Sequence, residues 1–458
     1  MMGQLPPEQN ALFYDFNLER HIPADHLLRR IDQFLDFNTI RQHLEPYYSA
    51  IGRPSIDPEL MIRMLLVGYC YGIHSERRLC EEVRMNLAYR WFCRLSLEDP
   101  VPDHSTFSKN RLGRFRSSDV LRLLFDTVVN RCVEEALVRG EGFAIDASFV
   151  RADVARQRAE PGPVDWTPAK VQSRAVKEYL ASLDQDADLN RPQKSVSLTD
   201  PMAQWSGAKG PAEFYYSTNY LIDTEHGVIM DVEASPSTLK LEVSTTRTMI
   251  DRVESTHDIK PKRLLGDMAY GAANNLGYLD EKNIEPHVPV RDKSHGKENT
   301  FAINQFRWLT DHYRCPAGKA LRRNNRNFRV PRTGITKAGT IIFRASQSDC
   351  GVCPMKSQCC PDTTHRKIAR SIHEEARDKA RAIVDTDEYR NKSFNERKKV
   401  EMLFAHMKRH LRFTRLRLRG LASANDEFLL MATVQNLRRM TRLCARPPPD
   451  RRLASAGT

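Results

Sequence analysis

"EGFAIDASFV", residues 141–150, is the stretch at which the pattern of this 458-residue chain changes. From Phe13 to about Leu137 the apolar residues recur at helical spacing, whereas this stretch is a short apolar run with aromatic and β-branched members. Such a run is typical of a strand. We therefore expect an N-terminal all-helical domain, followed by a mixed α/β part whose first strand carries Asp146.

Upstream of that strand, the clearest helix is predicted within "SIDPELMIRMLLVGYCYGI". Asp57 can cap this helix, because its side-chain oxygen can accept a free backbone N–H of the first turn. Pro58 suits the first helical position, where no hydrogen-bonding N–H is needed, and Gly72 suits the end. These three residues predict both ends of the helix.

A later helix is expected to begin in "PVPDHSTFSKNRLGRF", with Ser105 or Thr106 as its cap. A helix-turn-helix interpretation of this region would let four cations meet DNA phosphates: Arg77, Arg78, Lys109 and Arg111. A helical scaffold with a solvated basic face explains the same residues equally well.

Downstream, the predicted order of elements is hairpin, helix, strand. After a polar insert at 155–212, expected to be mostly loop with at most one helix, "FYYSTNYLID" and "GVIMDVEAS" flank "TEHG" and predict a hairpin. Residues 239–256 have helical spacing, and "KRLLGDMAYGA" runs a strand into Asp267. Another strand is expected at "IEPHVPV", and helices return near residue 371. The two strands that bring in Asp146 and Asp267 are thus expected in one sheet.

The chain is accordingly expected to have five parts: a helical, DNA-binding domain at 1–137, the first part of an α/β core at 138–290, an inserted Cys-containing subdomain at 291–370 with short strands at "NFRVPR" and "TIIFRA", the helical end of the core at 371–445, and a disordered tail at 446–458.

The charge balance points to a polyanionic partner. The chain has 71 Lys+Arg against 58 Asp+Glu, a formal net charge of +13. Nucleic acid is the first partner to consider, while acidic membranes and ribosomal assemblies are the alternatives. The N-terminus lacks the apolar core of a signal peptide, and the longest apolar stretch is short and interrupted by Arg63, so no membrane association is expected. We expect a cytoplasmic protein whose cysteines are thiols or metal ligands.

Asp146, Asp267 and one later glutamate together suggest a metal site. Two aspartates on neighbouring strands and a glutamate from a helix supply the hard oxygen ligands that suit Mg²⁺. Two such ions, roughly 3.5–4 Å apart, are the arrangement used in phosphodiester cleavage. Each acid alone has an ordinary explanation, because an aspartate at a strand end is usually a turn or cap residue.

The glutamate is Glu401, the single acid from Lys398 to Phe413 in the basic stretch "NERKKVEMLFAHMKRHLRF". At about 100° per residue, Arg397, Glu401 and Lys408 fall close together around the helix. An apolar stripe occupies the adjoining face: Val400, Phe404, Met407 and Leu411. The carboxylate is therefore expected beside the buried face of a helix, between cations.

At this point the sequence resembles the DDE transposases of bacterial insertion sequences. Phe394, Arg397, Glu401 and Lys408 are similar to that family's Y-x2-R-x3-E-x6-K signature, with Phe394 in place of the tyrosine. The resemblance extends through "GRPSIDPELMIRMLLVGYCYGIHSERRL", "PDHSTFSKNR", "FAIDAS", "SLTDPMAQW" and "LLGDMAYG", and covers nearly the whole chain from about residue 13 to residue 443.

The resemblance implies a ribonuclease H-like fold, a mixed sheet flanked by helices. It implies that Asp146, Asp267 and Glu401 are the catalytic residues and hold Mg²⁺, as two ions, or Mn²⁺. Arg397 and Lys408 would contact phosphates of double-stranded DNA at the transposon ends. Phe394 and Arg412 are expected on the same DNA-binding surface, although Phe394 lacks the hydroxyl of the family's tyrosine. Assembly on two ends implies at least a homodimer, located with the nucleoid.

The chemistry implied is Mg²⁺-dependent cleavage at the element's ends, followed by transfer of the freed 3′-OH into target DNA. No G-x4-G-K-[ST] motif is present, so ATP is not expected to drive the reaction. Two alternatives remain open from the sequence: a non-catalytic DNA-binding protein derived from a transposase, and a nuclease of the same fold that cuts without joining.

Four cysteines of the inserted subdomain are candidates for structural Zn²⁺: Cys315, Cys350, Cys353 and Cys359. Tetrahedral sulfur ligation can stabilise a segment that lacks a large core, but free thiols explain the same residues about equally well. Trp308 could hold a flipped base, although a core role is favoured. The remaining cysteines of the helical domain are expected to be buried small hydrophobes: Cys70, Cys80, Cys93 and Cys132.

Overall fold

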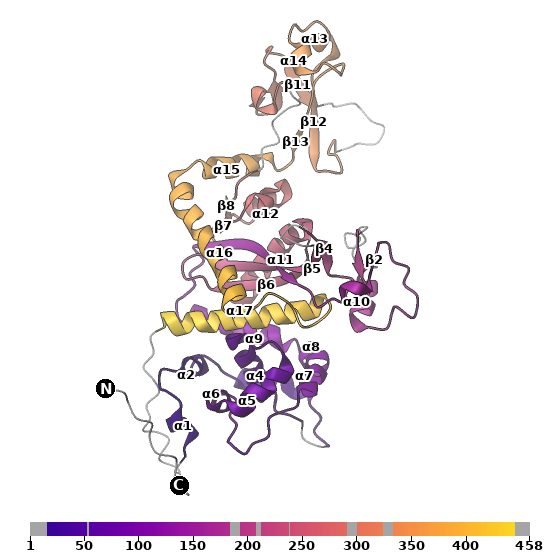
Figure 1. Ribbon diagram of the computed structural model, residues 1–458. Coiled ribbons are helices and arrows are strands. Elements are labelled where there is room, and N and C mark those ends of the chain that lie inside the picture. Colours follow the sequence, from indigo (N-terminus) through magenta and orange to yellow (C-terminus); the bar gives the residue numbers. More distant parts are fainter. Residues whose placement is uncertain are drawn as a thin grey trace, which may run out of the picture.

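A computed structural model describes residues 16–52, 55–183, 193–207, 212–237, 239–290, 300–323 and 333–444, without the side chains of residues 239–242. The strand predicted at "NFRVPR" and the tail predicted at 446–458 lie outside these ranges. Figure 1 shows three regions in succession: the N-terminal helices, a central sheet with its helices, and a small subdomain at the far end.

The N-terminal region is all-helical, as predicted. Its helices are α1 (Leu18–His21), α2 (Leu27–Asp32), α3 (Asn38–Leu44), η1 (Glu45–Tyr47), α4 (Pro58–Tyr71), α5 (Glu76–Met85), α6 (Leu87–Phe92), α7 (His104–Asn110), η2 (Arg111–Phe115), α8 (Arg116–Ser118) and α9 (Val120–Glu134). The predicted ends of α4 are confirmed: the Asp57 carboxylate accepts the Glu59 N–H, and Gly72 is left-handed with φ 67°. The four cysteines expected to be buried here are buried.

Two predictions for this region are wrong. Asp103, not Ser105 or Thr106, caps α7, because its carboxylate accepts the backbone N–H of Ser105. Arg111 is not available to phosphates, because its side chain is buried and faces Glu76 at 3.5 Å. A guanidinium can be buried when an acid on another helix faces it, as Glu76 of α5 does here. The spacing of the basic residues along the sequence does not reveal such a partner.

The central region contains a six-stranded mixed sheet. Its strands are β1 (Gly142–Arg151), β4 (Gln204–Ser206), β5 (Glu213–Asp223), β6 (Ile229–Pro236), β7 (Arg263–Leu265) and β8 (Glu285–His287), in the order β4-β5-β1-β7-β8, with β6 also paired to β5. β1 is antiparallel to β5 and parallel to β7, and β7 is parallel to β8. The predicted hairpin is β5 and β6.

Helices surround this sheet. They are α10 (Arg174–Leu183), α11 (Leu239–His257), η4 (Met268–Gly271), α12 (Ala273–Glu281), α15 (Glu374–Val384), η6 (Tyr389–Ser393), α16 (Phe394–Arg409) and α17 (Leu421–Leu443). The insert expected to be mostly loop holds α10, the 3-10 turn η3 (Arg156–Arg158) and the small pair β2 (Ala159–Glu160) and β3 (Val196–Ser197). It also supplies β4 to the sheet, which the sequence did not predict.

The small subdomain has its own five-stranded antiparallel sheet. Its elements are η5 (Ile303–Gln305), β9 (Arg307–Leu309), β10 (His312–Arg314), β11 (Ala320–Arg323), β12 (Thr340–Arg344), α13 (Gln347–Gly351), α14 (Lys356–Cys359) and β13 (Lys367–Ser371). No helix in the described part of the chain has the length and apolar run needed to cross a bilayer.

α17 joins the sheet to the N-terminal helices, and lies between them in Figure 1. Its Asn436 side chain both accepts from the Ile229 N–H and donates to the Ile229 carbonyl oxygen of β6, each at 2.8 Å. Asn425 accepts the Ala234 N–H at 3.0 Å. The two amides therefore satisfy backbone groups of β6 where another strand would otherwise pair.

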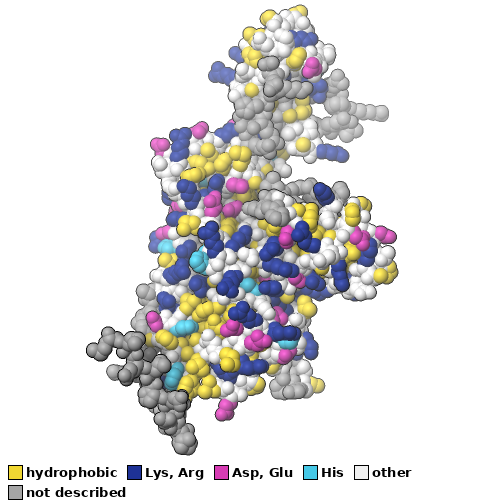
Figure 2. All heavy atoms as spheres, in the orientation of Figure 1, with side chains coloured by type: hydrophobic (Ala, Val, Ile, Leu, Met, Phe, Trp, Pro, Cys, Tyr) yellow, Lys and Arg dark blue, Asp and Glu magenta, His cyan; other side chains and the backbone are white. Residues whose placement is uncertain are grey.

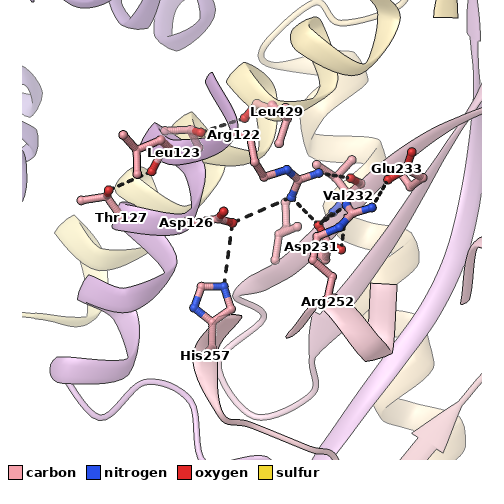
Figure 3. Close-up of polar contacts among 12 residues, drawn as sticks. Arg122, Leu123, Asp126, Thr127, Asp231, Val232, Glu233, Arg252, His257 and Leu429 are labelled. Atoms are coloured by element: carbon pink, nitrogen blue, oxygen red, sulfur yellow. Dashed lines mark hydrogen bonds and ion pairs between the residues drawn. The ribbon is translucent and has the colours of Figure 1, made fainter. Parts of the chain in front are cut away.

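A polar network also ties α9 to the sheet (Figure 3). Arg122 of α9 donates to the Asp231 carboxylate at 2.6 Å and to the Val232 carbonyl oxygen at 3.0 Å. Arg252 of α11 reaches Asp231 at 3.2 Å and Glu233 at 2.7 Å. Asp231 is 1% exposed, and a carboxylate this deeply buried needs opposite charge nearby. Two guanidinium groups from different helices supply that charge.

Glu427 of α17 links three segments inside this junction. Its carboxylate accepts the backbone N–H groups of Arg417 and Leu418, at 2.8 and 2.7 Å, and the hydroxyl of Tyr69 at 3.2 Å. Burial raises the pKa of Glu427 to about 7, although the positive charge of Arg111 and the hydrogen bonds lower it.

We predict that Glu427 makes the free energy of unfolding fall as pH rises from about 5 to about 7. Its folded pKa is above its unfolded value, so the folded protein binds the extra proton in this window and loses that stabilisation as the proton leaves. The slope from one proton is at most about 1.4 kcal/mol per pH unit. Urea unfolding at pH 5, 6, 7 and 8 should give a flatter profile for Glu427→Gln than for the unsubstituted protein.

The control is Glu388→Gln, which changes an exposed carboxylate in the same way, and its profile should follow that of the unsubstituted protein. Parallel profiles for Glu427→Gln and the unsubstituted protein would contradict the prediction.

Candidate active site

Two of the predicted acids lie at matching positions on adjacent parallel strands. In the register of β1 and β7, Ala144 is opposite Leu265. Asp146 and Asp267 each follow two residues later, and Asp267 comes just after β7 ends, where its carboxylate accepts the Ala269 N–H at 2.8 Å and caps η4. Parallel strands present equivalent positions on the same side of a sheet, so both carboxylates lie at one end of the β1–β7 pair.

Gly266 permits this close approach. A Cβ at this position would lie 3.2 Å from side-chain atoms of Ile145 and of Tyr270, tighter than ordinary packing. The residue before Asp267 is thus packed directly against the residue before Asp146. A side chain here would force Ile145 or Tyr270 to shift by a few tenths of an ångström.

The third acid comes from α16. The predicted apolar stripe is buried, with Val400, Phe404, Met407 and Leu411 each at 8% exposure or less. The ring of Phe404 lies 5.3 Å from that of Tyr220, the residue paired with Asp146 across β1 and β5. The apolar stripe therefore packs α16 against the strands next to Asp146, whereas the side chain of Glu401 is 58% exposed.

Lys408 also holds α16 against β1. Its Nζ donates to the Ser148 Oγ at 2.6 Å, and Ser148 lies two residues after Asp146 on β1. Alternate residues of a strand point to the same face, so Lys408 reaches the same side of β1 that Asp146 occupies. The sequence predicted a phosphate contact for Lys408 but did not predict this bond to the strand.

An ion pair holds the other end of α16. The guanidinium of Arg263, on β7, binds the Glu396 carboxylate through two hydrogen bonds of 2.7 and 3.0 Å. The two side chains are only 8% and 12% exposed. Ser393, at the N-terminal end of α16, accepts from Arg263 at 3.1 Å and lies 2.7 Å from the Nδ1 of His287 on β8.

Sequence reasoning missed Arg263, Glu396 and Ser393. Arg263 opens an otherwise apolar strand, which is a usable signal because a buried guanidinium requires an acid. Its partner is 133 residues away, however, and nothing in the sequence pairs the two.

The three predicted acids act on one another electrostatically. The pKa of Asp146 is raised to about 6: burial and the negative charges of Asp267 and Glu401 raise it, and the bond from the Ala147 N–H and the positive charge of Arg397 partly offset the rise. The carboxylates thus share one neighbourhood. Among the residues described, no three His, Cys, Asp or Glu side chains are gathered as they would be around a bound metal ion.

The donor set nevertheless suits a divalent cation. Three carboxylates supply oxygen ligands and up to three negative charges, and a cation between them would offset the negative charges that raise the pKa of Asp146. Asp146 comes from the sheet, Asp267 from a cap after a strand and Glu401 from a helix surface, so only the glutamate has a long and exposed side chain that can move toward an ion.

The predicted DNA-contacting residues lie along the exposed side of α16 and just after it. Arg397 is 4.0 Å from Glu401 and 29% exposed. Phe394 is 44% exposed, and the Nζ of Lys398 lies 4.6 Å from its ring centroid. Arg412 is exposed in the loop that follows the helix, where its φ of 54° is left-handed.

The comparisons with protein families give two matches. Residues 16–112 match a family model described as a transposase domain (DUF772), and residues 314–441 match a model described as a transposase DDE domain. This chain belongs to the DDE transposases. The second match includes Glu401, Arg397, Lys408, Phe394 and Arg412 of this transposase, whereas Asp146 and Asp267 lie between the two matched segments.

We predict that the ion pair between Arg263 and Glu396 strongly stabilises the packing of α16 against the sheet in this transposase. Arg263→Met should lower the free energy of unfolding by about 3 kcal/mol, because it leaves a nearly buried carboxylate without its partner. The matched control is Lys262→Met, which breaks the neighbouring pair with Glu141 and should cost much less stability, because both of its side chains are exposed. Chemical denaturation measures both, and equal losses would refute the distinction.

Proposed function

We propose that this transposase cuts DNA at the ends of its element and joins the freed 3′-OH to target DNA, using Asp146, Asp267 and Glu401 to hold Mg²⁺ or Mn²⁺. The observation that carries the proposal is the arrangement of the three acids: Asp146 and Asp267 lie at matching positions beyond the parallel pairing of β1 and β7, and α16, which carries Glu401, packs on the strands next to Asp146. The negative charges of Asp267 and Glu401 accordingly raise the pKa of Asp146. Bound divalent ions, two in number, would supply the positive charge that activates the attacking oxygen and steadies the leaving one.

A ribonuclease H-like core is part of the proposal. Its support is the order of elements along the chain: β1 with Asp146, the hairpin of β5 and β6, helix α11, strand β7 before Asp267, and the late helix α16. The order agrees with the one that the family resemblance implies. The three acids come from the same parts of this arrangement that the resemblance assigns to them.

The proposed chemistry proceeds in two displacements at phosphorus. In the first, a water oxygen forms a bond to the phosphorus at the element's end, the bond from phosphorus to the 3′ oxygen breaks, and a 3′-OH is released. In the second, that 3′-OH attacks a target phosphorus and displaces the target's own 3′ oxygen. One phosphodiester replaces another in the second step, so no ATP is needed.

The chain's own residues have positioning roles in this scheme. Arg397 and Lys408 lie on either side of Glu401 along α16, one turn before and two turns after it. We assign them to phosphates of the strand that enters the site, where a cation can bind a phosphate oxygen with a charge-assisted hydrogen bond. Lys408 would then keep α16 on β1 while presenting its charge toward the DNA.

Double-stranded DNA is the proposed partner, bound by a dimer that brings two ends together. Support comes from the net charge of +13 and from the surface: Figure 2 shows Lys and Arg side chains recurring across the middle of the face in view. Exposed cations continue after α16 in one loop: Arg412, Arg415, Arg417 and Arg419. Such a surface favours a phosphate backbone irrespective of base sequence.

The test of the catalytic assignment is cleavage of a supercoiled plasmid that carries the element's ends, with Mg²⁺ or Mn²⁺. Asp146→Ala, Asp267→Ala and Glu401→Gln should each reduce end cleavage by at least about 100-fold, because each removes charge from the reacting centre. The matched control is Glu388→Gln, which should stay active. Glu388 is 57% exposed and 3.9 Å from Lys392, much as Glu401 is 58% exposed and 4.0 Å from Arg397.

The products separate the alternatives. Cut ends together with insertions into target DNA support a transposase with both activities, whereas cut ends without insertions would indicate a nuclease. DNA binding with no cutting by the unsubstituted protein would indicate a non-catalytic binder. Equal activity of the three acid variants and the unsubstituted protein would refute the site.

Phe394 should contribute through its ring rather than through a hydroxyl. Its exposed ring beside Lys398 suits stacking on a base or sugar, so Phe394→Ala should weaken binding of end DNA about 10-fold, while Phe394→Tyr should bind at least as well as the unsubstituted protein. Affinity is measured with short duplexes of the end sequence. Met402→Ala, which truncates an apolar side chain that is 71% exposed on the same helix, is the control. Unchanged affinity of Phe394→Ala would contradict the role.

A further inference from the structure

Five cysteines of the small subdomain line one pocket. Cys315 follows β10, and the other four lie in or next to α13 and α14: Cys350, Cys353, Cys359 and Cys360. The pocket has a volume of about 30 Å³. A space of this size accommodates a single ion or water molecule and is far smaller than a site for an organic ligand, which occupies hundreds of Å³.

The subdomain has a very small hydrophobic core of its own. Six buried side chains form it: Phe306, Tyr313, Leu321, Phe343, Ala345 and Ile368. Cys315, Cys350 and Cys359 pack against this cluster, and so does Trp308, whose ring has Arg370 4.1 Å from its centroid. Trp308 is therefore part of the packing here, consistent with the core role favoured from the sequence. Cores of this size usually need a covalent or metal cross-link.

The chain around Cys315 forms a tight turn that directs an amide at the sulfur. The Gly318 N–H donates to the Cys315 carbonyl oxygen at 2.8 Å, and the Lys319 N–H donates to the Cys315 Sγ at 3.3 Å. Gly318 has φ 80°, which a side chain would disfavour. The turn therefore fixes the position of the Cys315 sulfur in the pocket.

The second group of cysteines is held in a comparable way. The Cys353 N–H reaches the Cys350 carbonyl oxygen at 3.4 Å, so the C-x2-C segment is a turn. Burial raises the pKa of Cys350 and that of Cys359, the latter to about 12, and neighbouring thiols contribute to both rises. For Cys350 a hydrogen bond with the backbone of Arg366 partly offsets the rise. A divalent cation in the pocket would reverse that balance, because it stabilises thiolates.

We propose that Cys315, Cys350, Cys353 and Cys359 bind one Zn²⁺, which fastens the turn after β10 to α13 and α14. Cys359 is assigned as the fourth ligand because it packs against the same small core as Cys315 and Cys350. The thiol of Cys360 lies beside those of Cys350 and Cys359, so the variants below compare Cys360 with Cys359 directly. The four thiols share the pocket without being gathered at the distances of a bound ion, so binding would draw them inward to about 2.3 Å from the metal. The site is structural and independent of the proposed DNA chemistry.

The first experiment measures the metal in the purified full-length protein. We expect about one zinc per chain by elemental analysis, and X-ray absorption at the zinc edge should show four sulfur neighbours at about 2.3 Å. This measurement needs no substitution, so it does not depend on a variant that folds. Protein without zinc, or zinc surrounded mainly by nitrogen and oxygen, would overturn the proposal.

The second experiment assigns the ligands. Serine at Cys315, Cys350, Cys353 or Cys359 should each remove most of the zinc, and should remove the sulfur-to-metal charge-transfer band of the Co²⁺-substituted protein. Cys360→Ser, the matched control from the same pocket, and Cys132→Ser, from the helical domain, should keep both. Zinc retained in all four variants would overturn the site. Zinc lost in Cys360→Ser but kept in Cys359→Ser would overturn the assignment of the fourth ligand.

Discussion

The arrangement of the candidate active site depends on the ion pair that joins Arg263 to Glu396. It connects the first residue of β7, the strand that leads to Asp267, with the first turn of α16, the helix that carries Glu401. Removing two charges from water costs free energy. Two parallel hydrogen bonds between Arg263 and Glu396, and one from Arg263 to the Ser393 hydroxyl, offset this cost. The position of the third acid is therefore set through the strand that positions the second.

The C-terminal end of α16 is held at the sheet by Phe404 and Lys408. Together with the Arg263–Glu396 ion pair at the other end, these contacts determine the position of the helix on the sheet. Phe404 packs on Tyr220, and Lys408 bonds to Ser148 on the strand that carries Asp146. Arg263 lies four residues before Asp267 and Ser148 two residues after Asp146 on parallel neighbouring strands, so a helix held at both residues passes the level of the aspartates. Three residues separated by 121 and 134 positions in the sequence thus come to act on one another.

The N-terminal helices are joined to the same sheet by polar side chains rather than by apolar packing alone. Arg122 of α9 binds Asp231 of β6, and β6 pairs with β5, which pairs with β1 (Figure 3). α17 also satisfies backbone groups of β6, through Asn425 and Asn436. Buried polar contacts have strict geometry, so they fix the register between helices and sheet more sharply than apolar side chains can.

What the sequence predicted, and what it could not, follows from the range of the interactions. The ends of α4, the hairpin, the buried stripe of α16 and the strand contexts of Asp146 and Asp267 depend on neighbouring residues, so local patterns were sufficient. The cap at Asp103 was missed because several suitable cap residues stand in a row. The burial of Arg111, the added strand β4 and the pairing of Arg263 with Glu396 depend on partners far along the chain, which a single sequence does not specify.

The three acids differ in how firmly the fold holds them, and the difference bears on the proposed function. Asp146 is part of a paired strand and half-buried, and the Asp267 carboxylate is fixed by the amide it caps. Glu401 is more than half exposed on a long side chain and has Arg397 4.0 Å away. Under the proposed function, two rigid ligands and one adjustable ligand would permit a site that closes when cation and DNA are both present. A phosphate that attracts Arg397 would weaken its hold on Glu401, so DNA entry would free the glutamate to approach the cation. The cations around Glu401 would then have two roles: they would attract the DNA strand, and they would moderate the repulsion among the carboxylates before the DNA arrives.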